Sequence, residues 1–489
     1  SQPDDAYPDA PWYAATDHET ERARHWLPCV DLPNVRTALD LHLRADARFT
    51  IVANGALIEE IDHGDGTKTA HWRLQERCPS YLICFAIGDL VCAPDGEFVD
   101  GSDPSQPKTI PVAYFCSRQH SADDLLRTFG RTKAMLAWMT NKLGLTFPFP
   151  KYYQFALPGI GGAMENISLV SWDEKYVLDA SLHQEFGWVI DQGNVHEMAH
   201  SYFGDAVVCR DFAHAWLKES WATYVGQLWR EDTSSLDEAL YVYFDHASSY
   251  FREADSEYKR PIVTRQFHSS WDMYDAHLYP GGACRLHTLR CELGDEVFWP
   301  AVRDYLQRFN GKVVETDDFR LVMEQHSGRS LGRFFDQWFH SPGYPDLKVS
   351  FSYDASRHQG TFEIEQQQVN AEQGIPIFTL NTELGWTIDG EQHLLPLRID
   401  QRKQVVIVAM AREPDQVRVD PHCKVLHKLA FNPGDPLLRR QLTEAPDVIG
   451  RILAAQELIK TGKRSNVQAV VEAYRGERFW GVRCEFAIA

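Results

Sequence analysis

Two histidines four residues apart, followed at a fixed distance by a glutamate, constrain this chain more than any other feature. Residues 194–205 have the letters NVHEMAHSYFGD, so His196, Glu197 and His200 form an HExxH motif. On a helix, residues four apart lie on one face, and both imidazoles can point at one metal ion. Glu197 lies beside them, where a carboxylate can take a proton from a metal-bound water. The segment therefore predicts a helix that faces a polar metal site.

The third ligand that such a site needs is Glu219, in the segment AWLKESWATYVG. Trp216, Ser220 and Tyr224 recur at helical spacing around it and predict a second helix. Two antiparallel helices with a short connection would bring Glu219 back over the histidines. Three protein ligands and one open position are typical of a catalytic zinc rather than a structural one. We therefore predict one Zn²⁺ per chain, bound by His196, His200 and Glu219, with Glu197 as the general base.

A second polar segment lies upstream, where residues 161–166 read GGAMEN. The Pro158-Gly159 pair and the two glycines interrupt any helix, so an edge strand or a loop is predicted. Taken together with HExxH and a glutamate nineteen residues after its second histidine, this segment resembles the GxMEN motif of the gluzincin aminopeptidases, the aminopeptidase N family.

Further motifs carry the same resemblance in the right order. Residues 19–33 are similar to the family segment that ends in ARxxxPCxDxP, and residues 336–345 resemble the end of the family's catalytic domain. Residues 279–283, YPGGA, stand where the family has a catalytic tyrosine in a YEKGA-like motif. The chain departs from the family at Lys218 and Ser220, which flank the third ligand where Asn and Gly are usual.

The resemblance implies how a peptide substrate is held. An aminopeptidase recognises a free α-ammonium group, which carboxylates bind by charge-assisted hydrogen bonds. The resemblance assigns this role to Glu165, aided by Glu19, whose alternative is an ordinary solvated glutamate. It also implies that Ala163 and Asn166 meet the substrate backbone.

The tetrahedral intermediate of peptide hydrolysis carries an oxyanion, which needs a hydrogen-bond donor besides the metal. The resemblance assigns this donor to Tyr279, and Tyr274 is the alternative. For Asp211, His214 and Lys218, which lie between or beside the ligands, we expect ordinary packing or support of the ligands.

The fold class that we predict is multidomain α+β. Residues 1–118 contain short β-rich runs and turns, and compare with the later part of the family's N-terminal β domain. Residues 119–345 are mostly helical, including an apolar stripe over 122–143, and are expected to form a thermolysin-like α/β zinc peptidase domain. Residues 346–432 alternate strands and polar turns, which predicts a β-sandwich. Residues 433–489 are predicted to start a helical, HEAT-like domain.

The composition of the chain limits the classes of partner that it is expected to bind. The formal charge of −20 disfavours nucleic acid and anionic membranes, which attract basic surfaces. No run of eighteen apolar residues occurs, so no membrane segment is predicted. Ten dispersed cysteines are typical of reduced, buried thiols and favour a cytoplasmic location. The chain starts without methionine and ends just after a helical pattern, so we expect a longer parent with additional N-terminal strands.

The function predicted from these features is a zinc-dependent aminopeptidase acting on peptides with a free N-terminus. Two alternatives remain open at this point. One is an epoxide hydrolase of the leukotriene-hydrolase type, against which the predicted β-sandwich argues. The other is a catalytically inert scaffold, for which all three ligands and Glu197 would have to be present without activity. The preferred N-terminal residue and the oligomeric state do not follow from the sequence.

Overall fold

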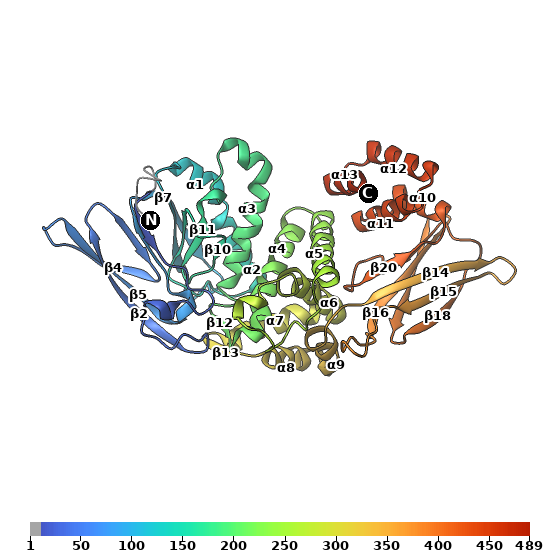
Figure 1. Cartoon of the computed structure of the whole chain (residues 1–489), viewed down its shortest axis with the longest axis horizontal. Coiled ribbons are helices and arrows are strands. Elements are labelled where there is room, and N and C mark those ends of the chain that lie inside the picture. Colours follow the sequence, from blue (N-terminus) through green and yellow to red (C-terminus); the bar gives the residue numbers. More distant parts are fainter. Residues whose placement is uncertain (1–10) are drawn as a thin grey trace. The chain divides into compact units, whose positions relative to one another are not determined.

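The computed structural model describes residues 11–489, which form two compact units. Unit 1 contains the chain up to residue 226 together with 265–274 and 296–329. Unit 2 contains 227–264, 275–295 and 330–489. The first ten residues of the predicted 1–118 domain lie outside the described part. The mixed architecture of helices and several sheets agrees with the predicted fold class, while the domain limits at 118, 345 and 432 remain predictions (Figure 1).

The N-terminal part of unit 1 consists of two small antiparallel sheets. One has the order β1 (Tyr13–Ala15), β6 (Phe85–Gly88), β3 (Thr50–Ala53), and the other β2 (Arg36–Asp46), β5 (Thr67–Pro79), β4 (Ala56–Asp62). Residues 81–87 do not form one continuous strand, because a 3-10 turn, Ser80–Leu82, precedes β6. The reason is Asn54, whose side chain bonds the backbone there as a neighbouring strand would. It donates to Leu82 O at 3.0 Å and accepts from Cys84 N at 2.6 Å.

A five-stranded sheet forms the centre of unit 1. Its order is β10 (Ala163–Met164), β11 (Leu169–Asp173), β9 (Tyr152–Leu157), β8 (Lys108–Cys116), β7 (Val91–Asp100), with the inner strands parallel. Phe115 and Phe155 of this sheet share one buried cluster with Ile51 and Trp72 of the N-terminal sheets. Strand β10 lies at the edge, so the edge-strand prediction for the GGAMEN segment is confirmed.

The helical stripe predicted over residues 122–143 is two helices, α1 (Ala122–Phe129) and α2 (Thr132–Leu143). The break falls at Gly130, and Thr132 uses its hydroxyl to donate to the Phe129 carbonyl at 2.7 Å, a bond that competes with continued helix. Both α1 and α2 pack beside α3 (Ala180–His200) in unit 1 (Figure 1). The remaining elements that include unit 1 residues are β12 (Val207–Cys209), α4 (Glu219–Thr233), α7 (Asp295–Phe309), β13 (Lys312–Val314) and α8 (Thr316–Ser327).

Unit 2 contains two sheets in the region predicted as a β-sandwich. The four-stranded sheet has the order β18 (Lys403–Ala409), β15 (Gln359–Gln366), β14 (Asp346–Asp354), β20 (Lys428–Phe431). The three-stranded sheet has the order β17 (Glu391–Ile399), β16 (Leu380–Ile388), β19 (Gln416–Val419). Buried residues alternate with partly or fully exposed residues along β15, as expected for a strand with one face on a core.

The helices of unit 2 precede and follow these sheets. They are α5 (Leu236–Ser256), α6 (Gly282–Leu293), α9 (Gly332–Phe335), α10 (Asp435–Glu444), α11 (Val448–Lys460), α12 (Arg464–Gly476) and α13 (Trp480–Ile488). The last four match the helical character predicted after residue 433. Across residues 11–489, none of the helices combines the length and the apolar character needed to cross a bilayer.

Candidate active site

The three predicted metal ligands lie together in unit 1. His196 and His200 come from the end of α3, and Glu219 is the first residue of α4. Nε2 of His196 lies 3.2 Å from Nε2 of His200. Oε2 of Glu219 lies 3.4 Å from the His196 nitrogen and 3.3 Å from the His200 nitrogen. The spacing in the sequence thus corresponds to a triangle of donor atoms with nearly equal sides.

This triangle has the size that a zinc ion needs. Tetrahedral ligands at about 2.0–2.2 Å from zinc are separated from one another by roughly 3.3–3.6 Å, close to the 3.2–3.4 Å found here. Nδ1 of His200 donates to the Phe203 carbonyl at 3.0 Å. This bond fixes the tautomer that leaves the Nε2 lone pair for a metal. The residues present therefore fit zinc both in donor type and in spacing.

The connection between the two metal-site helices is longer than the short one expected from the sequence. Strand β12 lies within it and pairs in parallel with β13, and a 3-10 segment, Phe212–Leu217, leads into α4. Gly204 has a φ of 132°, and a Cβ there would lie 3.3 Å from Nδ1 of His200. The rings of Phe203 and Trp221 stack with centroids 4.3 Å apart, which holds the connection against α4.

Glu197 is buried and faces the same polar site. Its carboxylate comes within 4.8 Å of ligand atoms of Glu165 and His200. Burial, reinforced by the charges of Glu165 and Glu219, raises the pKa of Glu197 well above its ordinary value, although His200 opposes the shift. A raised pKa makes the carboxylate a stronger base, which suits an acid–base role.

Lys218 supports the ligand Glu219, as one of the two roles predicted for it, and also bonds two further carboxylates that the sequence analysis did not connect with it. It is completely buried, and its Nζ pairs with three carboxylates: Glu165 at 2.7 Å, Glu219 at 2.9 Å, and Glu19. Although burial opposes charge on an amine, these carboxylates raise the pKa of Lys218 well above its ordinary value. Packing or ligand support was expected for Lys218, and the structure makes it the central cation of the cluster. The only signal in the sequence was its departure from the family's usual Asn.

Glu19 and Glu165 both lie beside the metal-site carboxylate. Ligand oxygens of Glu19, Glu165 and Glu219 lie within 4.8 Å of one another. The solvated alternative for Glu19 is wrong, because its side chain is buried and Tyr274 donates to its Oε1 at 2.5 Å. Burial, only partly offset by Lys218, raises the pKa of Glu19 to about 7. The two predicted ammonium-binding carboxylates thus share one buried cluster.

The other predicted substrate residues have different surroundings. Ala163 lies on edge strand β10 and is partly exposed. Asn166 follows that strand, and its buried side chain donates to Ser171 Oγ at 3.1 Å. Contact of either residue with a substrate backbone remains a prediction.

Of the two tyrosine candidates, Tyr274 lies in unit 1, in contact with the Glu19 carboxylate. Tyr279 lies in unit 2, in the π-helical segment His277–Gly281, and its catalytic role remains a prediction.

Asp211 and His214 pack as expected. Asp211 accepts from Ala213 N at 3.0 Å and so begins the 3-10 segment, while Nδ1 of His214 bonds the Thr316 hydroxyl at 2.9 Å. The prediction of ordinary structural roles for these two residues is confirmed.

The segment that carries Glu19 is expected to lose stability in acid. His18 donates from Nδ1 to the Ile83 carbonyl at 2.6 Å, and its Nε2 accepts from the Trp26 indole at 2.7 Å. Burial lowers the pKa of His18, despite the opposing bond to Ile83. A lowered pKa means that the unfolded chain binds the proton more readily, so stability is fully present above about pH 6.5 and falls as the pH drops towards the folded pKa.

We therefore expect the unfolding transition, followed by tryptophan fluorescence, to occur at a denaturant concentration that decreases below about pH 6.5. The variant His18→Gln should show a flatter pH dependence. Equal pH dependence of the two proteins would contradict this assignment.

Comparison with known proteins adds independent findings. Residues 127–338 match the family model described as the peptidase family M1 domain, and residues 5–82 match the model of the peptidase M1 N-terminal domain. The chain is 25% identical over 392 residues to aminopeptidase M1-C of Oryza sativa subsp. japonica, a match that covers 79% of the chain and 43% of that protein. It is 24% identical over 401 residues to glutamyl aminopeptidase of Bos taurus, covering 78% of the chain and 39% of the relative.

Among solved structures, the chain is similar to the Legionella pneumophila aminopeptidase A crystallised with aspartic acid. The TM-score is 0.78 at 18% identity, over 97% of this chain and 54% of that one. At this identity the likeness establishes the fold alone. The chain spans about two fifths of the length of the curated relatives that it matches.

Proposed function

This chain belongs to peptidase family M1, and from that membership we propose that it is a zinc-dependent aminopeptidase that removes the first residue of peptides with a free amino terminus. The observation that supports the proposal most strongly is the triangle of His196, His200 and Glu219 donor atoms, with sides of 3.2–3.4 Å. Neither the epoxide-hydrolase hypothesis nor the inert-scaffold hypothesis has a comparable observation in its favour.

In the proposed mechanism, His196, His200 and Glu219 would hold a zinc ion. The chemistry that zinc supplies at such a site is polarisation of a carbonyl group and a lowered pKa of water. Glu197 takes the proton from the attacking water and then delivers it to the leaving amine. Tyr279 is the proposed donor to the oxyanion, with Tyr274 as the alternative.

The carboxylates around Lys218 supply the exopeptidase character. Glu19, Glu165 and Glu219 carry three negative charges when ionised, and Lys218 neutralises one of them. Because Glu219 would be a ligand of the zinc ion, the excess negative charge would lie at Glu19 and Glu165, where it would attract a substrate ammonium. An ammonium held at a fixed distance from the metal site presents only the first peptide bond to the water. A cytoplasmic location remains part of this proposal.

The test is hydrolysis of leucyl, alanyl and arginyl amides by the purified chain, with metal content measured alongside. We expect about one zinc per chain, cleavage of free-amine substrates, and loss of activity after chelation that zinc restores. N-acetylated versions of the same amides should not be cleaved. Equal cleavage of free and blocked amides would refute the exopeptidase proposal.

A variant separates ammonium binding from the chemistry. Glu165→Ala should lower kcat/KM for the free amides by about 10- to 100-fold, because a charge-assisted hydrogen bond contributes about 1.5–3 kcal/mol, and should leave the zinc content unchanged. Glu97→Ala removes an exposed glutamate of β7 and is the matched control, with no expected effect. If Glu165→Ala cleaves free amides as the parent does, the role given to Glu165 is wrong.

A further inference from the structure

The two carboxylates proposed to bind the substrate ammonium come from distant segments of unit 1. Glu19 follows His18, whose Nδ1 donates to the Ile83 carbonyl at 2.6 Å. Glu165 lies between the two-residue strand β10 and a turn at residues 167–168. Ligand oxygens of the two glutamates nevertheless lie within 4.8 Å of one another. The backbones of the two segments must therefore be held at a defined separation.

This separation matters because one ammonium group has to reach both carboxylates. Charge-assisted N–H···O bonds are about 2.7–2.9 Å long, so two acceptors at the tetrahedral angle around one nitrogen lie about 4.6 Å apart. The spacing of Glu19 and Glu165 agrees with this value. A shift of about 1 Å between the segments would take one oxygen out of hydrogen-bond range. Lys218 contacts the carboxylate groups themselves, so the placement of the backbones behind them depends on other contacts.

Asn54 bonds both segments with one side chain. Its Nδ2 donates to the Ile167 carbonyl at 2.7 Å and to the Leu82 carbonyl at 3.0 Å. Its Oδ1 accepts from the Cys84 N–H at 2.6 Å. The first bond holds the turn that follows the GGAMEN segment, and the other two hold the backbone on either side of Ile83. Asn54 is completely buried, so loss of its side chain would leave these backbone groups unsatisfied.

The turn at Ile167 and Ser168 has a backbone conformation that its sequence disfavours. Ser168 has a φ of 62°, in the left-handed region that residues with a Cβ rarely adopt. Its buried hydroxyl accepts from the Gly55 N–H at 2.8 Å and from Lys151 Nζ at 3.2 Å. Gly55 follows Asn54, so the loop between β3 and β4 bonds this turn twice. Such conformations persist only where the surrounding contacts fix them, and they cluster at functional sites.

We propose that Asn54 is a positioning residue for the substrate ammonium, because its side chain sets the separation of the segments that carry Glu19 and Glu165. This role rests on the function proposed above for those two glutamates. Asn54 is completely buried, so it acts through the carboxylates and not by contact with the substrate. Loss of its bonds displaces the ammonium site rather than the metal ligands, so the effect is confined to molecules with a free amine.

The test compares two ligands that differ only in the amine. Leucine hydroxamate has an α-ammonium group, whereas 4-methylpentanehydroxamate has the same side chain and the same metal-binding group without it. Their dissociation constants are measured on the zinc-loaded chain by isothermal titration calorimetry, and the ratio of the two constants gives the preference for the amine. In Asn54→Ala this preference should fall by about 2- to 12-fold, the factor that one neutral hydrogen bond contributes. Binding of the amine-free compound and the zinc content should not change.

A second variant changes only the side of the contact that carries Glu165. Ser168→Gly removes the hydroxyl that accepts from Gly55 but keeps the turn, since glycine adopts a positive φ readily. The preference for the amine should again fall, with the zinc content unchanged. This variant also tests the proposal if Asn54→Ala fails to fold.

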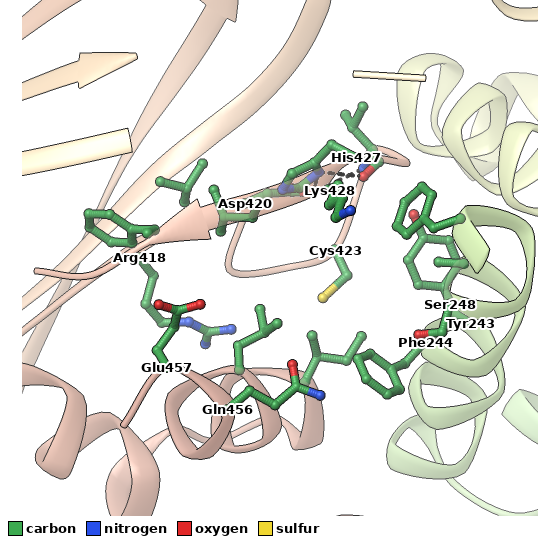
Figure 2. A pocket seen from close by; sticks show the side chains of 18 of the residues that line it. Tyr243, Phe244, Ser248, Arg418, Asp420, Cys423, His427, Lys428, Gln456 and Glu457 are labelled. Atoms are coloured by element: carbon green, nitrogen blue, oxygen red, sulfur yellow. Dashed lines mark hydrogen bonds and ion pairs between the residues drawn. The ribbon is translucent and has the colours of Figure 1, made fainter. Parts of the chain in front are cut away.

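The matched control is Asp420→Asn in unit 2. Figure 2 shows Asp420 at the wall of a cavity that is lined by residues of unit 2. Its buried carboxylate accepts from the N–H groups of Lys424 and Val425, both at 3.0 Å, so it holds a backbone segment much as Asn54 does. Asp420→Asn weakens this contact and should keep the full preference for the amine.

The possible results separate the role of Asn54 from the proposed function. If the parent binds both hydroxamates equally, the proposed ammonium site is wrong, and the role of Asn54 is wrong with it. If the parent prefers leucine hydroxamate and both variants keep that preference, only the role of Asn54 is wrong. Equal weakening of both compounds in the variants, or loss of zinc, would show that Asn54 merely supports the fold, and would also overturn the proposal.

Discussion

Replacing Glu197 by Gln is expected to lower kcat for leucyl amide by about 10²- to 10⁴-fold, the usual contribution of a general acid–base residue. The amide keeps the shape of the side chain but cannot accept the proton of the attacking water. Because Glu197 is buried beside the ligands and is not one of the three ligands in the proposed site, zinc binding should persist. The measurements are steady-state kinetics and zinc per chain by atomic absorption.

The matched control is Glu185→Gln, which changes an exposed glutamate on the same helix, α3. It should retain full activity and full zinc content. Two results would count against the assignment of Glu197. One is activity within about twofold of the parent, because the loss of an acid–base residue would lower the activity far more than that. The other is loss of zinc together with activity, which would make Glu197 a ligand rather than a base.

Replacing Lys218 by Met is expected to destabilise unit 1 by about 3–5 kcal/mol, the usual cost of removing one partner from a buried ion pair. Lys218 is fully buried against Glu19, Glu165 and Glu219, so its loss leaves three carboxylates in mutual repulsion. The free energy of unfolding is measured by urea titration, with and without zinc. The loss should be larger without zinc, since a bound cation would compensate part of the same negative charge.

Lys175→Met removes an exposed lysine and serves as the control, with a change within about 0.5 kcal/mol. Lys218→Arg retains the charge and should lose less stability than the Met variant. A Met variant as stable as the parent would show that the carboxylates take up protons at no significant cost, and that Lys218 is dispensable to the cluster.

The spacing of the ligands was predictable because it depends on local helix geometry. Residues four apart on a helix share a face whatever surrounds them, so His196 and His200 could be paired from the sequence alone. The position of the GGAMEN segment at a sheet edge was also predictable from local sequence, because its glycines interrupt a helix. Only a short strand, Ala163–Met164, forms there.

The cluster around Lys218 was not predictable in the same way. Lys218 and Glu19 are separated by 199 positions, and no periodic pattern connects them. A lysine is exposed in most proteins, so burial of its charge depends on where three distant carboxylates fold. The break between α1 and α2 was missed for a related reason, since the apolar stripe continues across Gly130 while the Thr132 hydroxyl bond does not appear in any hydrophobic pattern.

The pairing of β12 with β13 has a consequence for biosynthesis. The connection between the helices that carry His200 and Glu219 is held by residues 312–314, about a hundred positions later in the chain. During translation, both metal-binding helices leave the ribosome well before the strand that fixes their connection. Folding proceeds largely as the chain emerges, so the geometry of the proposed zinc site is completed only after Val314 has been synthesised. A nascent chain stalled between residues 230 and 310 should therefore lack the assembled metal centre although it contains every ligand.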